Sequence, residues 1–483
     1  MERRVASLKR VAGGVWKLKR AGYAEEMLPW REFRQELPPL IRLAAPLVIA
    51  ELGWMTMGVV DTIMVGRLSK EAMGGVSIGG ILFYAIAVFG MGVLLGLDTL
   101  VSQAFGAGRL EECHRSLVSG LWLAVLLSAP LMALVSLGIH PLRWLGIQQA
   151  ILAHARPYLD SIVWSLPPLL IYAALRRYLQ GMNLTAPVTF ALLSANLVNA
   201  VANYALIFGH WNMPALGAAG AGWATTISRV YVVAVLAGYA AWWDQRVNAG
   251  LRRVSPAPDW AGIRALWRLG LPASAQITLE VGVFALTGAL IGRFPAQYIA
   301  AHQIALNAAS MTFMVPLGLG SAAAVRVGQA VGRGDAAAAA RAGWMAIALG
   351  GAFMALAGVC FLAFPRLIGR AYTNDAMVIE TATVLLWIAA LFQFFDGLQG
   401  VTTGALRGLG DTRTAAVTHL VSYWIIGLPL GCWLAFGRNW YAAGMWTGLC
   451  VSLVAIGVVL VAVWRRRVSE LRLSRLAVSS SSA

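Results

Sequence analysis

Charge is scarce in this 483-residue sequence: 12% of its residues are Asp, Glu, Lys or Arg, whereas 59% are hydrophobic and the mean hydropathy is +0.70. Soluble domains carry about twice that share of charged residues. The deficit excludes a soluble globular protein and indicates a chain that lies mostly within a membrane.

Cysteine and the common catalytic motifs are scarce as well. The four cysteines (Cys113, Cys360, Cys432 and Cys450) show no CxxC spacing, which argues against a disulfide framework or a cysteine-ligated metal. The sequence has no GxxxxGKS/T loop, no HExxH motif and no Ser/His/Asp set, and its histidines are isolated. We therefore expect no direct use of ATP, no cofactor and no enzymatic activity, and an integral membrane enzyme is the least favoured function.

Acidic residues are few, 21 against 38 basic ones, and the formal net charge is +17. With the N-terminal tail placed inside, the two tails and the inner loops hold 29 of the basic residues and the outer loops hold 8, while Arg229 lies within an apolar stretch. This asymmetry follows the positive-inside rule and predicts that both termini are cytoplasmic. The basicity indicates contact with anionic membrane lipids, and no nucleic-acid partner is expected.

Long apolar stretches, in contrast, occur throughout the chain. Windows of about 20 mostly apolar residues are long enough to cross a bilayer. None shows the alternation of a strand, and a backbone in lipid must satisfy its own hydrogen bonds, so each window is predicted to be a helix. The twelve expected spans lie near residues 40–66, 76–103, 118–139, 158–180, 187–209, 217–242, 263–292, 298–324, 343–365, 381–405, 415–436 and 442–464.

The sequence is also duplicated, with a nearly constant offset between its two halves. The landmarks that recur are Pro46 and Pro272, Gln103 and Gln329, Gly106 and Gly332, Gly181 and Gly408, and Gly220 and Gly444. Duplication in so apolar a chain is typical of transporters whose substrate path lies between two homologous halves. The expected fold class is an all-α polytopic membrane protein, with twelve transmembrane helices in two six-helix lobes related by a pseudo-twofold axis along the membrane normal.

The predicted organisation has five parts. The N-terminal tail lacks the apolar core of a signal peptide, and arginine outnumbers lysine 34 to 4, a bias typical of GC-rich bacterial genomes. We therefore expect a bacterial inner membrane protein. Its parts are a basic cytoplasmic tail (1–38), an N-lobe (39–242), a cytoplasmic linker (243–262), a C-lobe (263–465) and a second cytoplasmic tail (466–483).

Five carboxylates lie well inside the apolar stretches: Glu51, Asp61, Asp98, Glu280 and Asp396. Each costs roughly 2.5–3.5 kcal/mol at the centre of a membrane helix, so none is expected to face lipid. A buried carboxylate either captures a proton or a cation, or pairs with a cation such as Arg229 to hold helices together. Pairing is favoured for Glu51 and Asp98, and ion coupling for the other three.

The repeat supports this division, because Asp61, Glu280 and Asp396 have no acidic counterpart in the other half. Features that the fold requires recur in both halves, so features that do not recur are candidates for function. Each of the first two acids also follows a proline, Pro46 or Pro272, that lies a few residues inside its span. Such a proline bends a helix, and the bend is either a coupling element or a static kink.

Polar side chains accompany these acids at helical spacing. Asn199 and Asn203 share one face of the fifth span, and Gln303 and Asn307 share one face of the eighth. Such stripes are either interhelical hydrogen bonds, worth about 0.6 kcal/mol each, or the walls of a wet cavity. Aromatic side chains near them, Phe392 among others, are candidates for cation–π contact with organic cations.

Five stretches carry a resemblance to a known family: PLVIA (46–50), VDTIMVG (60–66), LDTLVSQAFGAG (97–108), AAHQIALN (300–307) and ALRGLGDT (405–412). They resemble segments of the multidrug and toxic compound extrusion (MATE) family, in its NorM-like branch, and the resemblance runs from about residue 38 to 465. It implies a central cavity between two lobes and export of cationic or amphipathic drugs, driven by inward sodium or protons.

The resemblance also implies roles for individual residues. Asp61 matches the functional acid of the N-lobe, Asn199 and Asn203 match polar residues near it, and Glu280 and Asp396 match the paired acids of a C-lobe cation site, with Na⁺ as one candidate ion. Gln303 and the outer-loop Asp375 lie where NorM-like members place substrate-contacting groups. Asn307 is a candidate cavity residue because it lies one turn from Gln303. Phe392 stands where sodium-dependent members often have tyrosine, which removes an oxygen ligand and favours proton coupling.

Three functions therefore remain as alternative hypotheses. The first is a secondary-active multidrug exporter that works as an H⁺ or Na⁺ antiporter, with small organic cations and membrane lipids as partners and a monomer as the expected state. The second is a flippase for a lipid-linked precursor, which would favour a strongly basic lateral cavity. The third is the membrane enzyme.

Overall fold

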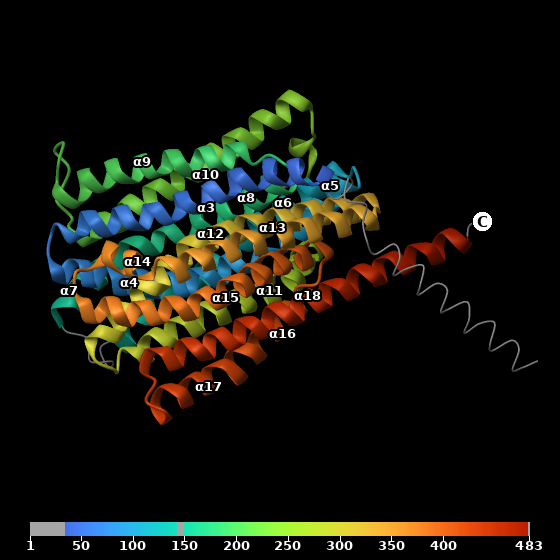
Figure 1. The fold of residues 1–483 in the computed structure, drawn as a ribbon. Coiled ribbons are helices and arrows are strands. Elements are labelled where there is room, and N and C mark those ends of the chain that lie inside the picture. Colours follow the sequence, from blue (N-terminus) through green and yellow to red (C-terminus); the bar gives the residue numbers. More distant parts are fainter. Residues whose placement is uncertain (1–33, 143–148, 482–483) are drawn as a thin grey trace, which may run out of the picture.

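The computed structural model describes residues 34–142 and 149–481. In this part of the chain it has twelve helical segments long and apolar enough to cross a membrane, which confirms the predicted spans and the all-α fold class. The described chain begins and ends at the same end of the bundle, from which the last helix projects (Figure 1). We call this the terminal end and the opposite one the loop end.

The first six spans use nine helical pieces, because two spans are interrupted. The pieces are α3 (Leu37–Gly66), α4 (Lys70–Val93) with α5 (Gly96–Gly106), α6 (Leu110–Leu142), α7 (Gln149–Ile162) with the 3₁₀ turn η1 (Val163–Ser165) and α8 (Leu166–Gly181), α9 (Ala186–Phe208) and α10 (Ala218–Val247). A further 3₁₀ turn, η2 (Leu251–Arg253), lies in the linker.

The second six spans are α11 (Trp260–Ile291), α12 (Ala296–Arg333), α13 (Ala336–Ala363), α15 (Ala376–Leu409), a composite eleventh span, and α18 (Tyr441–Ser481). A short helix, α14 (Pro365–Tyr372), precedes α15. The eleventh span combines α16 (Arg413–His419), the π-helix η3 (Leu420–Gly427), α17 (Leu428–Cys432) and the π-helix η4 (Trp433–Gly437).

Side-chain caps and left-handed glycines set several helix ends. Ser69 accepts a hydrogen bond from the N–H of Ala72 at the start of α4, and Asp335 accepts one from the N–H of Ala338 at the start of α13. Gly334, which follows α12, has φ +76°. The left-handed backbone conformation costs glycine little free energy and costs other residues more. The polar and glycine-rich stretches between apolar windows therefore end one helix and begin the next.

The helix ends differ from the predicted part boundaries in three places. Helix α10 continues to Val247 and α11 begins at Trp260, so the connection is shorter than the predicted 243–262 linker. Helix α18 continues to Ser481, beyond the predicted end of the C-lobe at 465. Glu470 forms ion pairs with Arg466 and Arg467 at helical spacing, which supports helix outside the apolar segment. The predicted tail 1–38 lies mostly outside the described residues.

Two separate hydrophobic cores hold the bundle together, one for each half of the sequence, but the first helix of each half contributes to both. Leu40, Leu43 and Leu47 of α3 belong to the core of the second half, whereas Ala50 and the rest of α3 belong to the core of the first. Helix α11 does the reverse: Ile263 and Leu266 join the first core, and Val283 and Ile291 join the second. The lobes are therefore interlocked by two helices that cross between them.

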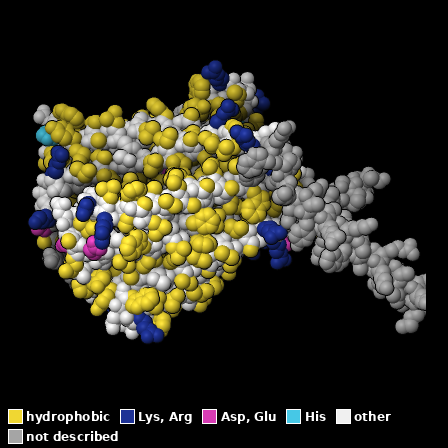
Figure 2. Space-filling model, in the orientation of Figure 1, with side chains coloured by type: hydrophobic (Ala, Val, Ile, Leu, Met, Phe, Trp, Pro, Cys, Tyr) yellow, Lys and Arg dark blue, Asp and Glu magenta, His cyan; other side chains and the backbone are white. Residues whose placement is uncertain are grey.

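The outer surface matches a membrane environment. Figure 2 shows a broad hydrophobic belt, with basic side chains gathered toward the two ends of the bundle. Large apolar side chains are also exposed, and Ile81, Phe190 and Leu197 are each more than 60% exposed. An apolar surface of this extent is stable only when lipid covers it.

Candidate functional site

The predicted N-lobe acid, Asp61, accepts hydrogen bonds from two neighbouring helices. Asn203 of α9 donates to one carboxylate oxygen at 2.5 Å, and Thr225 of α10 donates to the other at 3.1 Å. The same Asn203 amide also donates to Asn199 at 3.1 Å, and both asparagines are fully buried. The structure thus brings together three residues that the sequence predicted as one cluster, and adds Thr225.

We call Asp61, Asn199, Asn203 and Thr225 the N-lobe acid cluster. No basic side chain lies within 4 Å of its carboxylate in the described part of the chain. The amide nitrogen of Asn199 and the amide oxygen of Asn203 are buried and have no partner among the described residues. Unused donors and acceptors beside an unpaired carboxylate provide polar atoms for a proton, a water molecule or a cation.

The two predicted C-lobe acids are linked by one glutamine. Gln399 donates from a single amide nitrogen to Glu280 at 3.2 Å and to Asp396 at 3.1 Å, and Gln276 donates to the other oxygen of Glu280 at 2.9 Å. Helix α11 supplies Gln276 and Glu280, one turn apart, and α15 supplies Asp396 and Gln399. Two carboxylates that share one neutral donor repel each other when both are ionised, so the pair favours uptake of a proton or a cation.

A histidine that is isolated in the sequence completes this group. His419 of α16 is fully buried, and its Nε2 lies 3.7 Å from the Glu280 carboxylate. The same nitrogen lies 3.1 Å from the side-chain oxygen Oε1 of Gln399 and 3.3 Å from the side-chain nitrogen Nε2 of Gln276. Its Nδ1 is 2.8 Å from the Ala415 carbonyl. We call Gln276, Glu280, Asp396, Gln399 and His419 the C-lobe acid cluster.

The π-helix η3 follows His419 directly and carries two aromatic residues toward this cluster. Tyr423 packs edge-on against His419 at 5.7 Å, and its buried hydroxyl has no partner among the described residues. Trp424 donates to the Leu279 carbonyl at 3.1 Å. A π-helix adds a residue per turn and is common at functional sites; here it places two successive aromatic residues beside α11.

The other two membrane carboxylates are paired with arginine, as predicted, although the partner is not Arg229. Glu51 is bound to Arg176 inside the N-lobe. Asp98 of α5 lies 3.0 Å from Arg407 of α15 and 3.4 Å from Arg177 of α8. The Asp98 pair therefore connects the two lobes, whereas the Glu51 pair is contained within one.

Arg229 instead contacts uncharged groups. Its guanidinium donates to Ser165 at 2.5 Å and lies over the ring of Phe83 at 4.9 Å and that of Trp54 at 5.6 Å. No carboxylate lies within 4 Å of it in the described residues. Among the described residues, the membrane interior thus contains one guanidinium with no carboxylate within 4 Å and three carboxylates with no Arg or Lys within 4 Å. This is not the strongly basic cavity that a flippase would favour.

Four predicted cavity residues form no hydrogen bond with either acid cluster in the described part of the chain. Gln303 and Asn307 are exposed on one face of α12, and Asp375 caps the start of α15 through the N–H of Met377 at 2.9 Å. Phe392 is 2% exposed and is stacked on Trp446 at 5.5 Å. Phe392 lies one helical turn before Asp396 on α15. Its ring is nevertheless covered by Trp446 of α18.

The lobes meet at the terminal end through contacts that repeat the internal symmetry. Gln103 of α5 donates to the Gly408 carbonyl at 2.9 Å, and its repeat counterpart Gln329 of α12 donates to the Gly181 carbonyl at 2.8 Å. Since Gly181 and Gly408 are also counterparts, the two bonds form one motif used twice. The landmarks that revealed the duplication are therefore contact residues between the lobes.

Glycines make this approach possible. A Cβ on Gly106 would lie 2.1 Å from the Gln329 carbonyl oxygen, and one on Gly332 would lie 2.0 Å from the Gln103 carbonyl oxygen. Nothing larger than glycine fits between these backbones. We call these contacts, together with the Asp98–Arg407 ion pair, the inter-lobe seal.

The two prolines lie where α3 and α11 pass from one lobe to the other. In α3, Leu47 belongs to one core and Ala50 to the other, directly after Pro46, and Thr189 of α9 donates to the Pro46 carbonyl at 2.7 Å. In α11, Pro272 lies between Leu266 and Val283, which also belong to different cores. Since a proline bends a helix, each proline lies where a bend would set the position of one lobe relative to the other.

No group of three or more His, Cys, Asp or Glu side chains converges as a metal site within the described ranges. The predicted Na⁺ site at Glu280 and Asp396 therefore has two carboxylates, and any further oxygen ligands for a hard cation come from amides, hydroxyls, carbonyls or water.

Comparison with known proteins gives a consistent result. The MatE family model matches residues 46–205 and 272–433, which are the two halves defined above. "Probable multidrug resistance protein NorM" of Bradyrhizobium diazoefficiens is 36% identical over 433 residues, covering 88% of this chain and 92% of that protein. The protein of the same name in Xylella fastidiosa is 36% identical over 443 residues, covering 91% and 94%.

Solved structures share the fold. A crystal structure of a eukaryotic MATE transporter superposes with a TM-score of 0.83 at 22% identity, covering 92% of this chain and 99% of the other. The outward-facing conformation of a multidrug resistance MATE family transporter gives 0.80 at 17% identity, covering 89% and 96%.

Proposed function

This chain belongs to the MatE family of multidrug and toxic compound extrusion transporters, in its NorM-like branch, and on that premise we propose that it exports cationic or amphipathic organic compounds in exchange for protons. The membrane is the bacterial inner membrane, and the terminal end faces the cytoplasm, as the distribution of arginine indicates. The protein acts as a monomer, uses no ATP and needs no cofactor.

The observation that carries this proposal is the division of the five membrane carboxylates. Glu51 and Asp98 have arginine partners, whereas Asp61, Glu280 and Asp396 have neutral donors and no Arg or Lys within 4 Å in the described residues. A carboxylate kept unpaired in a membrane interior is costly unless it binds something. A proton and an organic cation can both bind to such a carboxylate. Because they compete for the same negative charge, binding of one releases the other.

The partners of the C-lobe acid cluster favour protons over sodium as the coupling ion. Gln276 and Gln399 direct amide nitrogens, not oxygens, at the carboxylates, and His419 supplies a second titratable group 3.7 Å from Glu280. A proton needs a carboxylate and a path, whereas a hard cation needs several oxygen ligands. A sodium ion would require the side-chain amides of Gln276 and Gln399 to rotate, so that their oxygens face the ion.

Alternating access follows from the interlocked lobes. Antiport requires that the seal at the cytoplasmic end opens when the opposite side closes. Proton uptake at Asp61 or at the C-lobe acid cluster changes the charge beside α3 or α11, the two helices that pass between lobes at Pro46 and Pro272. These helices are therefore the coupling elements in the proposed cycle.

The test is transport of ethidium into inverted membrane vesicles or proteoliposomes under an imposed proton gradient and, separately, a sodium gradient. We expect ethidium movement with the proton gradient, abolished by a protonophore and unchanged by sodium. Movement driven by sodium alone at fixed pH contradicts proton coupling, and absence of movement under either gradient contradicts the exporter function.

A further inference from the structure

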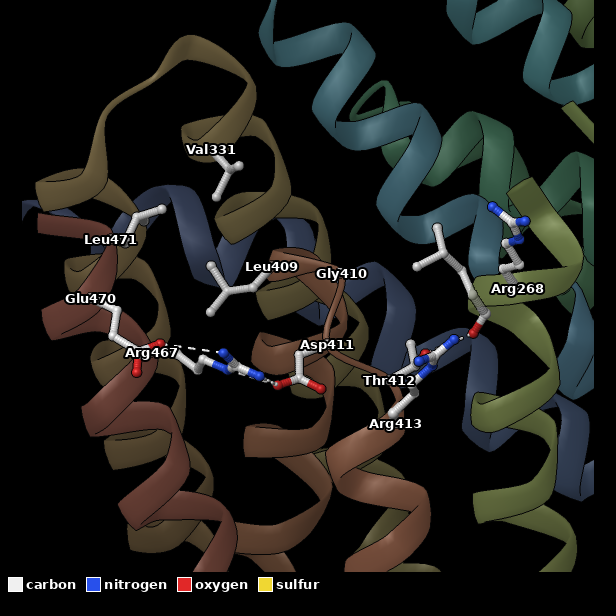
Figure 3. Close-up of a pocket in the computed structure, with 11 residues that line it drawn as sticks. Arg268, Val331, Leu409, Gly410, Asp411, Thr412, Arg413, Arg467, Glu470 and Leu471 are labelled. Carbon is white, nitrogen blue, oxygen red and sulfur yellow. Dashed lines mark hydrogen bonds and ion pairs between the residues drawn. The ribbon is translucent and has the colours of Figure 1, made fainter. Parts of the chain in front are cut away.

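A pocket of about 680 Å³ lies at the terminal end of the C-lobe, away from both acid clusters. Five segments form its walls: the first part of α11, the end of α12, the end of α15 with its following loop, the start of α16 and the projecting part of α18 (Figure 3). These are all places where an apolar span gives way to basic sequence. On the proposed orientation, the pocket therefore lies at the level of the inner-leaflet head groups.

The charges on its walls are not balanced. Arg467 of α18 binds Asp411 at 2.7 Å and Glu470 at 3.3 Å, so both acidic side chains of the pocket are already occupied. Arg268 and Arg413 have no carboxylate within 4 Å in the part of the chain that the structure describes. Three arginines against two acids leave one net positive charge, and Figure 3 shows the two unpaired arginines on the side opposite the Arg467 ion pair.

The remaining walls are apolar. Leu269, Val331, Leu409 and Leu471 line the same space, and Thr412 closes one side by donating to the Leu269 carbonyl at 2.9 Å. A pocket with unpaired guanidinium groups and aliphatic walls at a membrane surface matches a ligand with a phosphate and the beginning of hydrocarbon chains. Arginine is well suited to phosphate, because its planar set of N–H donors matches the phosphate oxygens.

We propose that this pocket binds the phosphate head group of an anionic membrane lipid. Arg268 and Arg413 donate to the phosphate oxygens, and the leucine side chains contact the glycerol and the first carbons of the acyl chains. Basic pockets between transmembrane helices on the cytoplasmic side bind such head groups in other membrane proteins. The proposal does not depend on which compound is exported or which ion is exchanged.

The pocket shares a loop with the inter-lobe seal. Arg407 and Gly408 contact the N-lobe through Asp98 and Gln103, while Asp411 and Thr412, a few residues later, are held by Arg467 and α11. A lipid bound between Arg268 and Arg413 adds a further support on the pocket side of this loop. Its binding therefore stabilises the arrangement in which the seal is closed.

The experiment uses the purified full-length transporter in a neutral detergent and follows its thermal unfolding. Phosphatidylglycerol, phosphatidylcholine and inorganic phosphate are titrated separately at matched phosphate concentrations. The test variant is Arg268→Gln with Arg413→Gln, and the control is Arg252→Gln with Arg253→Gln, which removes the same charge from exposed arginines of η2. All four side chains are exposed, so the two double variants are expected to fold equally well.

We expect phosphatidylglycerol, but not phosphatidylcholine, to raise the melting temperature of the parent and the control. Each arginine near an anionic lipid contributes about fivefold in affinity, so the test variant should need roughly 30-fold more phosphatidylglycerol for half of the effect. An equal response of test variant and parent, or an equal effect of both lipids, overturns the proposal. A full effect from inorganic phosphate alone overturns the lipid as the source of the phosphate.

Discussion

Neutralising Asp98 should shift the transporter away from the sealed arrangement. Its side chain is 1% exposed, and Arg407, across the lobe boundary, is 11% exposed. Removing one partner of a buried ion pair costs about 3–5 kcal/mol, because the remaining charge is left in a poorly solvated place. When the lobes separate, water again solvates the guanidinium groups of Arg407 and Arg177. The lost ion pair therefore raises the free energy of the sealed state and not that of the unsealed state. If the sealed state is destabilised by about 3 kcal/mol, the ratio of unsealed to sealed molecules rises about 100-fold in Asp98→Asn.

A cysteine reporter measures this ratio. Ser102 is fully buried in the seal, and its oxygen lies 1.9 Å from where a Cβ on Gly328 would be. Ser102→Cys, in a chain whose four native cysteines are replaced, should react with a maleimide only when the lobes part. We expect the labelling rate to rise about 100-fold with Asp98→Asn. Arg407→Gln should give a smaller rise, since Arg177 remains 3.4 Å from Asp98.

The matched control is Glu51→Gln. It breaks an equally buried arginine pair, with side chains 10% and 7% exposed, but one that lies inside the N-lobe. It should lower the melting temperature without changing the labelling rate. Equal labelling of Asp98→Asn and the parent, or equal acceleration by Glu51→Gln, would refute the role assigned to the inter-lobe pair.

Three further predictions concern the acid clusters and the seal. Glu280→Gln and Asp396→Asn should each abolish drug resistance at normal membrane expression, and normal efflux in either variant removes that residue from the mechanism. Asp61→Asn should abolish the pH dependence of drug release, measured in vesicles against the parent. Gly332→Ala should lower thermal stability and transport, because its Cβ would lie 2.0 Å from a carbonyl oxygen, whereas Gly58→Ala, with nothing within 4 Å, should be neutral.

The sequence predicted most of the fold because its signals are local or periodic. Span lengths follow from bilayer thickness, and the repeat placed Gln103 and Gln329 in equivalent positions before any contact was known. The Asp61–Asn203 contact was predictable because each residue has a defined position on an apolar helix. Gln276 and Gln399 were detectable in principle, since each lies one helical turn from an acid.

The remaining features depend on tertiary packing. His419 has no acidic neighbour in its own span, so only the approach of α11 and α15 reveals its place. The π-helical turns of the eleventh span have no clear sequence signature, and they determine where Tyr423 points. The packing of Phe392 could not be read from the sequence either, because its ring is stacked on Trp446, some fifty residues away. Arg407, which pairs with Asp98 across the lobe boundary, is likewise more than 300 residues distant in the sequence.

The exchange of helix ends between the two cores has a consequence for synthesis in the cell. Leu266 of α11 fills part of the first core, and a Cβ on Gly96 would lie 2.8 Å from it. The first six spans therefore leave the ribosome with an incomplete core, which is filled only when the seventh span is inserted. A half-length chain ending before α11 should be unstable in the membrane, and separately expressed halves should accumulate only together. The duplicated ancestor that this symmetry implies would then have functioned as a pair of chains, each completing the other.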